Sequence, residues 1–265
     1  MAAGPSHSEL RIAGFGACMI RGYPHDSGGM CDVARAAVEK ELSRPVRSTV
    51  ISLGGFPAPR AEKYLKRKVL SGFNPHYVIL QFSSLDAQCA LRRGNRTAPD
   101  RAHSRPAPNE DLGYQGRPAS TLSLLRWEVA TLIGHLRRAE PITPLPLHLA
   151  AMERMAKDCR AAGAMPVVLS PFLYGSRYTA RNAIGYAKAL QDLAKAQGII
   201  FVDCMHALRS KAKRQILQHD GFHLSLIGQR LIGQAIAKAI VANVTGQQNA
   251  EGVQAISSLR SEGLV

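Results

Sequence analysis

The sequence has no apolar run long enough to span a membrane, and Met1–Glu9 lacks the basic and apolar regions of a secretory signal. Its cysteines are few and widely spaced, and the five of them form no Cys-x-x-Cys pair or metal-ligand pattern. We therefore expect no disulfide framework, no metal and no cofactor. This usage is typical of a cytoplasmic protein with reduced thiols.

Acidic residues are scarce: 19 of them stand against 34 basic residues, which gives a formal net charge of +15. Such a charge can attract nucleic acid, anionic lipid or an acidic substrate. The sequence has no zinc finger, RNA-recognition signature or basic heptad, the modules that usually accompany nucleic-acid binding. We therefore favour a basic surface with an arginine-rich loop, and polyanion binding stays an alternative.

Short apolar runs alternate with longer helical patterns along the chain. The apolar runs predict buried strands at 10–15, 49–53, 77–82, 165–169 and 199–202. The patterns between and after them predict helices at 31–42, 60–70, 147–162, 180–196 and 225–243. This alternation favours a parallel sheet covered on both faces, with reactive groups beyond the carboxyl ends of its strands. The sequence thus predicts an α/β fold, a three-layer α/β/α sandwich around a flavodoxin-like parallel five-stranded sheet of order 2-1-3-4-5.

We expect a single domain over residues 10–243, because a chain of this length can bury one sizeable core. Residues 92–120 interrupt the alternation, since they carry four prolines and six arginines without apolar periodicity. This composition predicts a flexible insertion or lid. The pattern at 121–138 predicts an amphipathic helix, and residues 244–265 form a polar C-terminal tail.

The clearest chemical pattern is the run Asp220-Gly221-Phe222-His223-Leu224, just before the last predicted helix. A carboxylate can orient an imidazole, and the imidazole can then take a proton from a nucleophile. Ser225 fits a helix N-cap, which is a structural role. The run resembles the final block of the SGNH/GDSL hydrolase superfamily, whose Asp and His complete a catalytic triad. The resemblance covers about residues 11–240 and implies these roles for Asp220 and His223.

The first block of that superfamily, Gly-Asp-Ser-x-x-x-Gly after the first strand, corresponds here to Gly16-Ala17-Cys18-Met19-Ile20-Arg21-Gly22. Cys18 stands where the family has its nucleophilic serine, and Ala17 replaces the aspartate. A thiolate is a strong nucleophile, and a nearby imidazole lowers the pKa of a thiol. The alternative is that Cys18 is a small buried hydrophobic residue, the role that we assign to the other four cysteines.

The second block of the family supplies a glycine N–H to the oxyanion hole, and Gly54-Gly55 follows the second predicted strand here. We choose Gly55, with Gly54 as the alternative, because glycine lets a substrate oxygen approach the backbone closely. A plain turn between strand and loop explains the same spacing. The N–H of Cys18 is the second expected oxyanion donor.

The third block departs from the family, whose pattern is Gly-x-Asn-Asp, because the matching run is Ser83-Ser84-Leu85-Asp86. Leu85 takes the place of the oxyanion asparagine and cannot donate a hydrogen bond. Losing one such donor typically costs about 100- to 1000-fold in rate. Ser84 can substitute if the loop shifts by one residue. We expect Gln81 to point along the strand, where it is less able to reach.

The resemblance implies an esterase or acylhydrolase that cleaves a small ester or thioester, an O-acetyl ester among them, through a Cys18-His223-Asp220 triad. Two alternatives stay open. The replacements at Cys18 and Leu85 favour a catalytically impaired protein that binds a ligand, and the arginine-rich segment favours a basic polyanion-binding module. The sequence gives no oligomeric state.

Overall fold

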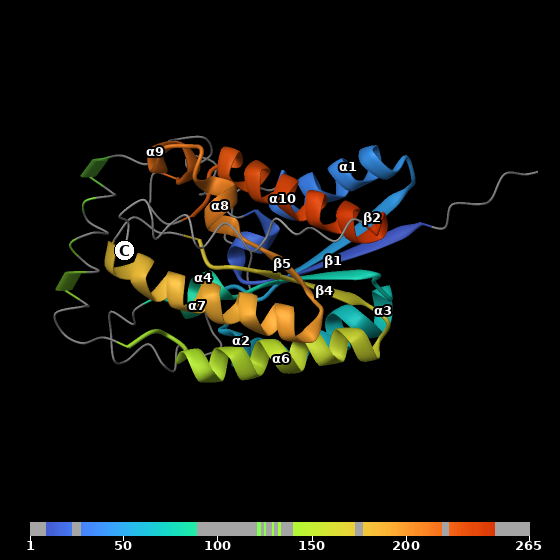
Figure 1. Cartoon of the computed structure of the whole chain (residues 1–265), viewed down its shortest axis with the longest axis horizontal. Helices are drawn as coiled ribbons and strands as arrows, with labels where there is room; N and C mark the ends of the chain where they lie inside the picture. Colours follow the sequence, from blue (N-terminus) through green and yellow to red (C-terminus); the bar gives the residue numbers. More distant parts are fainter. Residues whose placement is uncertain are drawn as a thin grey trace, which may run out of the picture.

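The computed structural model describes residues 9–22, 28–88, 140–172, 177–218 and 223–246, together with six helical residues between 121 and 133. Its architecture is a three-layer α/β/α sandwich in which a central sheet lies between two layers of helices (Figure 1). The sheet has five parallel strands in the order β2-β1-β3-β4-β5, which confirms the predicted flavodoxin-like fold.

The strands are β1 (Leu10–Gly16), β2 (Val46–Ser52), β3 (Tyr77–Gln81), β4 (Met165–Leu169) and β5 (Ile200–Val202). Every residue of the central strand β3 is buried. Tyr77 and Ile79 belong to one hydrophobic core, whereas Val78 and Leu80 belong to the other. This alternation is what a strand covered on both faces requires, and it places the next side chain, Gln81, on the face of Tyr77 and Ile79.

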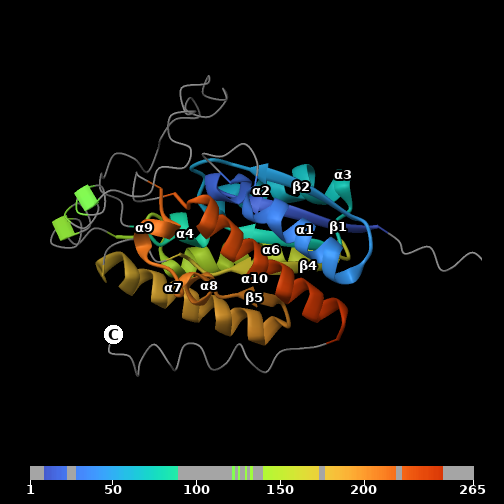
Figure 2. The same cartoon turned by 90° about the horizontal axis from the view of Figure 1, so that it is seen from above.

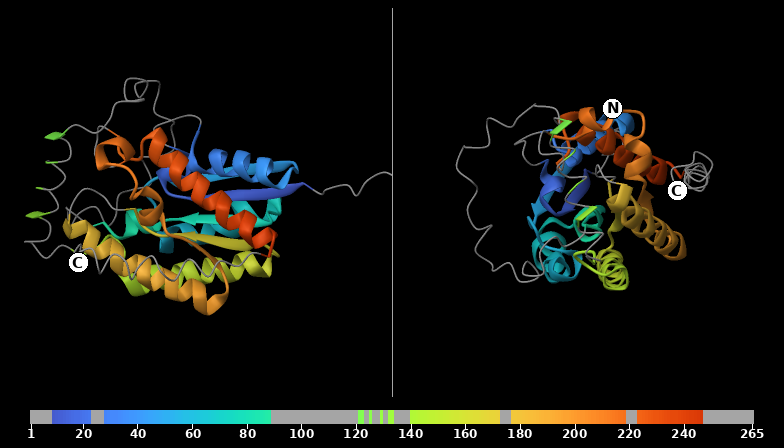
Figure 3. Two further views of the ribbon diagram at one scale, coloured as in Figure 1. Left: turned by 45° about the horizontal axis from the view of Figure 1, so that its top comes forward. Right: turned by 90° about the vertical axis from the view of Figure 1, so that its left-hand side faces the viewer.

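The helices form one layer on each face of the sheet (Figures 1 and 2). One layer contains α1 (Met30–Leu42), α8 (Cys204–Leu208) and α10 (Leu226–Val244). The other contains α2 (Ala58–Leu65), α6 (Leu145–Ala161) and α7 (Arg177–Gln197). The turned views in Figure 3 show α10 beside α1 on one side of the sheet and α6 on the other.

α1 and α10 approach each other closely because α10 has Gly233 at their contact. A Cβ at this position would lie 2.6 Å from Cβ of Val33 and 2.7 Å from the carbonyl oxygen of Met30. The side chain of Gln229 also joins the two helices, since its Oε1 accepts the N–H of Met30 at 3.1 Å. α1 and α10 are therefore held in a fixed relation.

The prediction from the sequence places the start of one strand wrongly and does not include the short helices. β2 begins at Val46 rather than at Thr49, because its polar residues lie at an edge of the sheet where only partial burial is needed. The helix α2 continues into a wider π-type turn at Lys66–Leu70 and then into α3 (Ser71–Phe73).

The predicted insertion 92–120 and most of the predicted helix at 121–138 lie outside the described residues, as does the tail beyond residue 246. No helix in the described ranges is both long and apolar enough to cross a bilayer.

Candidate active site at the carboxyl ends of the strands

Cys18 lies just beyond β1, as the first residue of the short 3-10 helix η1 (Cys18–Arg21). The next two side chains, Met19 and Ile20, are buried in the core below α1 and α10, so the backbone of η1 is anchored. η1 ends at Gly22, whose φ of 92° lies in the left-handed region that favours glycine. The Gly-x-x-x-x-x-Gly spacing of this motif therefore builds a tight turn that holds a half-buried Cys18 at the carboxyl end of β1.

His223 is distant from Cys18 in the sequence but contacts it in the fold. Its Nε2 lies 3.4 Å from Sγ of Cys18, although 205 residues separate the two positions. This distance is within reach of a hydrogen bond to sulfur. It is the arrangement that a thiol and its general base require, and it favours a catalytic role for Cys18 over the role of a buried hydrophobic residue.

The backbone around His223 is fixed by several hydrogen bonds. The N–H of Gln218 donates to the carbonyl oxygen of His223 at 2.7 Å, and Nε2 of Gln218 donates to that of Leu224 at 3.0 Å. Ser225 caps α10, since its Oγ accepts the N–H of Gly228 at 3.2 Å, which is the structural role expected for it. Asp220, the predicted partner of the imidazole, lies outside the described residues.

Cys18 is more exposed than the other described cysteines. Cys31, Cys159 and Cys204 are at most 1% exposed. Desolvation raises the pKa of all three thiols, to about 12 for Cys159. A thiol with such a pKa stays protonated at neutral pH and is a poor nucleophile. Cys89 lies outside the described residues.

The second block lies against the first. The N–H of Leu53 donates to the carbonyl oxygen of Gly16 at 2.9 Å, and the hydroxyl of Ser52 donates to that of Ala17 at 3.2 Å. The turn that follows contains Gly54, with φ of 52°, and Gly55, which is exposed. Within the described ranges, the N–H groups of Cys18 and Gly55 donate to no protein acceptor, so both are available to an oxyanion.

The third block forms the short helix α4 (Ser83–Asp86) directly after β3. Ser84 is buried, and its Oγ accepts the N–H of Phe172, beyond the end of β4, at 3.0 Å. Leu85 is half-buried. The hydroxyl hydrogen of Ser84 is not used in its bond to Phe172, but this bond fixes the position of Oγ next to β4.

Asp86 accepts hydrogen bonds in a buried polar network that the sequence analysis missed. Its Oδ2 accepts the N–H of Ala58, the first residue of α2, at 3.0 Å. The same oxygen lies 2.6 Å from Nδ1 of His148, on α6, and Oδ1 accepts the hydroxyl of Thr143 at 2.9 Å. The carboxylate thus joins the start of α2 and the start of α6 to α4.

His148 extends this network to Ser83, whose Oγ lies 3.3 Å from Nε2 of the imidazole. Ser83, His148 and Asp86 are the residue types of a hydrolytic triad. The side chains of His148 and Asp86 are 0% exposed, however, and their polar atoms are already paired with other groups of the protein. We interpret the set as structural. In the sequence, Asp86 matches the aspartate that ends the third block of the family, whereas His148 lies in an ordinary amphipathic pattern that indicates no special role.

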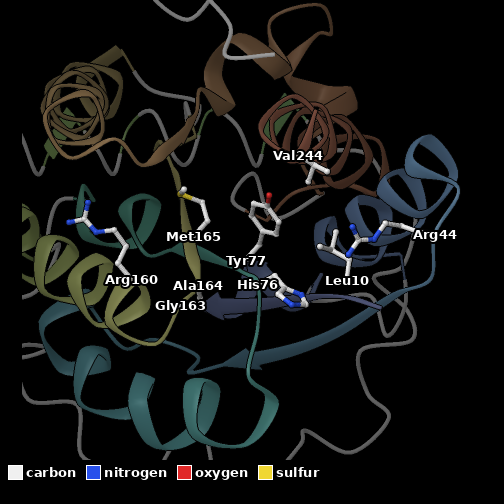
Figure 4. A pocket seen from close by; sticks show the side chains of 9 residues that line it. All are labelled: Leu10, Arg44, His76, Tyr77, Arg160, Gly163, Ala164, Met165 and Val244. Atoms are coloured by element: carbon white, nitrogen blue, oxygen red, sulfur yellow. The ribbon is translucent and has the colours of Figure 1, made fainter. Parts of the chain in front are cut away.

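A separate cavity of about 510 Å³ opens at the amino ends of the strands (Figure 4). It is lined by Leu10, Arg44, His76, Tyr77, Arg160, Gly163, Ala164, Met165 and Val244. These residues come from the opposite end of the sheet from Cys18 and His223. The cavity therefore takes no part in chemistry at Cys18.

In the described part of the chain, no group of three or more His, Cys, Asp or Glu side chains could hold a metal ion.

Comparisons with known proteins assign the chain to a family. The GDSL-like lipase/acylhydrolase family matches residues 13–231. No curated protein matches the sequence. Among solved structures, a lipase/acylhydrolase from Enterococcus faecalis superposes with a TM-score of 0.60 and 17% identity, over 88% of this chain and 96% of that one.

Two esterases have a similar fold. The psychrotrophic esterase EstA from Pseudoalteromonas sp. gives a TM-score of 0.57 at 13% identity, over 89% of this chain and 98% of that one. A catalytic mutant of an acetylxylan esterase from Geobacillus stearothermophilus gives 0.57 at 11% identity, over 87% and 94%. At these identities the superpositions establish the shared fold.

Proposed function

Since the chain belongs to the GDSL-like lipase/acylhydrolase family, we propose that it cleaves a small ester or thioester through a Cys18-His223-Asp220 triad. The family supports a hydrolase that acts on ester bonds. The observation that carries the proposal is the 3.4 Å contact between Sγ of Cys18 and Nε2 of His223. A cysteine nucleophile needs a base at this distance, and the fixed backbone on both sides keeps the pair together.

The proposed reaction has two halves. His223 takes the proton of Cys18 as Sγ attacks the carbonyl carbon of the substrate, and the carbonyl oxygen becomes an oxyanion. When the tetrahedral intermediate collapses, the bond to the leaving alcohol or thiol breaks, and His223 returns the proton to that group. His223 then deprotonates a water molecule, which attacks the acyl-cysteine, and the carboxylic acid leaves as the thiol is restored.

Three groups are proposed to stabilise the oxyanion. The N–H groups of Cys18 and Gly55 have no protein acceptor within the described ranges, which supports this role. The hydroxyl of Ser84 is the third expected donor. Leu85 supplies none, and this replacement favours the second candidate function, a catalytically impaired protein that binds an ester-like ligand.

A substrate panel tests the function. We expect Cys18-dependent hydrolysis of p-nitrophenyl acetate and an acetyl thioester, with slower hydrolysis of the octanoyl analogues. The fold shared with an acetylxylan esterase supports starting with O-acetyl esters, acetylated xylo-oligosaccharides included. Saturable binding of these esters without turnover would instead support the impaired protein.

Alkylation measures the activation of Cys18 without any substrate. We expect iodoacetamide to label Cys18 at least about tenfold faster than Cys31, Cys159 or Cys204, because His223 can accept its proton and burial keeps the other thiols protonated. Time-resolved peptide mass spectrometry at pH 7 gives the four rates.

His223→Ala is the informative variant for this experiment, because it removes the base and leaves the thiol in place. It should slow the labelling of Cys18 and leave the rates at the three buried cysteines unchanged. Equal labelling of Cys18 in both proteins would show that the imidazole does not activate the thiol.

A further inference from the structure

Gln81 is a buried amide without a hydrogen-bond partner. Its side chain is 1% exposed, yet neither Nε2 nor Oε1 has a partner in the part of the chain that the structure describes. An unpaired amide in the interior destabilises the folded state, and each such group in a native protein calls for a physical reason. A group that acts on a bound ligand is one such reason, because its partner is absent in the free protein.

The position of Gln81 connects it with the Cys18 motif. It is the last residue of β3 and lies opposite Gly16 in the register with β1. Its carbonyl oxygen accepts the N–H of Ala17, the residue before Cys18, at 3.0 Å. The backbone of Gln81 thus supports the turn that carries Cys18.

The sequence predicts that the side chain of Gln81 points along its own strand. In the structure it instead crosses from β3 onto β1. A Cβ at Gly16 would lie 2.9 Å from Cβ of Gln81 and 3.0 Å from its Oε1. The amide therefore occupies the space above Gly16, on the face of the sheet where Cys18 packs against the core. The glycine at position 16 is what allows the amide to lie there.

We propose that the Nε2 of Gln81 is the side-chain hydrogen-bond donor to the oxyanion, the role that Leu85 cannot fill. This inference rests on the proposed reaction at Cys18. Glutamine carries the same amide as asparagine on a side chain longer by one methylene. Ser84 is the weaker candidate, since its Oγ is held by the N–H of Phe172, whereas both polar atoms of Gln81 are unused.

The variant Gln81→Met tests the proposal because it keeps the length of the side chain and removes the amide. For p-nitrophenyl acetate we expect kcat to fall about 100- to 1000-fold, as for the loss of one oxyanion donor, with KM unchanged. The melting temperature should stay the same or rise, because two unpaired polar atoms leave the core. Iodoacetamide labelling of Cys18 should keep its rate, since alkylation forms no oxyanion.

Gln229→Met is the matched control for stability. Gln229 is equally buried, but its amide is paired, with Oε1 accepting the N–H of Met30 and Nε2 donating to the carbonyl oxygen of Met19. Its melting temperature should fall, the opposite of the result at Gln81. If Gln81→Met lowers the melting temperature by the same amount as Gln229→Met and retains its kcat, then Gln81 has a purely structural role.

Leu85→Asn supplies an independent readout. If the asparagine and Gln81 serve the same oxyanion, then Leu85→Asn should raise kcat by about tenfold or more in the Gln81→Met background, and by less in the wild type. Equal effects in both backgrounds would overturn the shared role.

The outcomes separate this inference from the function on which it rests. Cys18-dependent turnover in the wild type, with kcat retained in Gln81→Met, overturns the role of Gln81 alone. A parallel loss of kcat and of Cys18 labelling also overturns it, in favour of a group that positions the thiol. Absence of Cys18-dependent turnover in the wild type overturns the proposed function itself.

Discussion

Replacing Cys18 with alanine is expected to lower kcat/KM for ester hydrolysis by about 10⁴- to 10⁶-fold, the range found when one member of a covalent catalytic set is removed. The substitution deletes the sulfur that lies 3.4 Å from His223, and no other described thiol can take its place because all are buried. The measurement is steady-state hydrolysis of p-nitrophenyl acetate, with intact-protein mass spectrometry to detect the acyl-cysteine.

Cys159→Ala is the control, since Cys159 lies in the other hydrophobic core. It should retain its turnover and lose only stability. The double variant Cys18→Ala with His223→Ala should lose no more activity than either single variant, because the two side chains act as one unit. Undiminished hydrolysis by Cys18→Ala would place the reaction at a different site.

The second large effect concerns stability. Asp86→Ala is expected to lower the free energy of unfolding by about 3–5 kcal/mol, because it leaves three buried groups without their partner and each such group costs about 1–3 kcal/mol. The substitution leaves the N–H of Ala58, the hydroxyl of Thr143 and Nδ1 of His148 without their acceptor, in a region closed to water. Urea unfolding followed by circular dichroism measures the loss.

Asp203→Ala is the matched control, because Asp203 is an aspartate that only caps a helix. Its side chain accepts the N–H groups of Met205 and His206 at the start of α8. Removing such a cap costs about 1 kcal/mol. If Asp86→Ala loses no more stability than Asp203→Ala, then the Asp86 network does not hold the helices together as described.

The sheet could be predicted because each strand is a short apolar run between turn residues, and the helices between the strands have a clear apolar face. The Cys18–His223 pair could be predicted only through the family's motifs, since nothing local to either residue points to the other. Asp220 stays a prediction, because it lies outside the described residues.

Two features near the site could not be predicted, for different physical reasons. His148 has the spacing of any residue on the buried side of α6, and its role depends on Asp86 arriving from a distant segment. The direction of Gln81 depends on the empty space above Gly16 in the neighbouring strand, which appears only when β1 and β3 are paired. Both are properties of tertiary packing rather than of local sequence.

The packing of α1 against α10 sets the order in which the chain can mature. A chain emerging from the ribosome can pair β2, β1, β3 and β4 while the last helix is still unsynthesised. The core residues below α1 that contact α10 stay uncovered until then, and His223, which comes just before α10 in the chain, is also synthesised late. A chain that stops before this segment therefore exposes apolar surface and lacks the contact between Cys18 and His223.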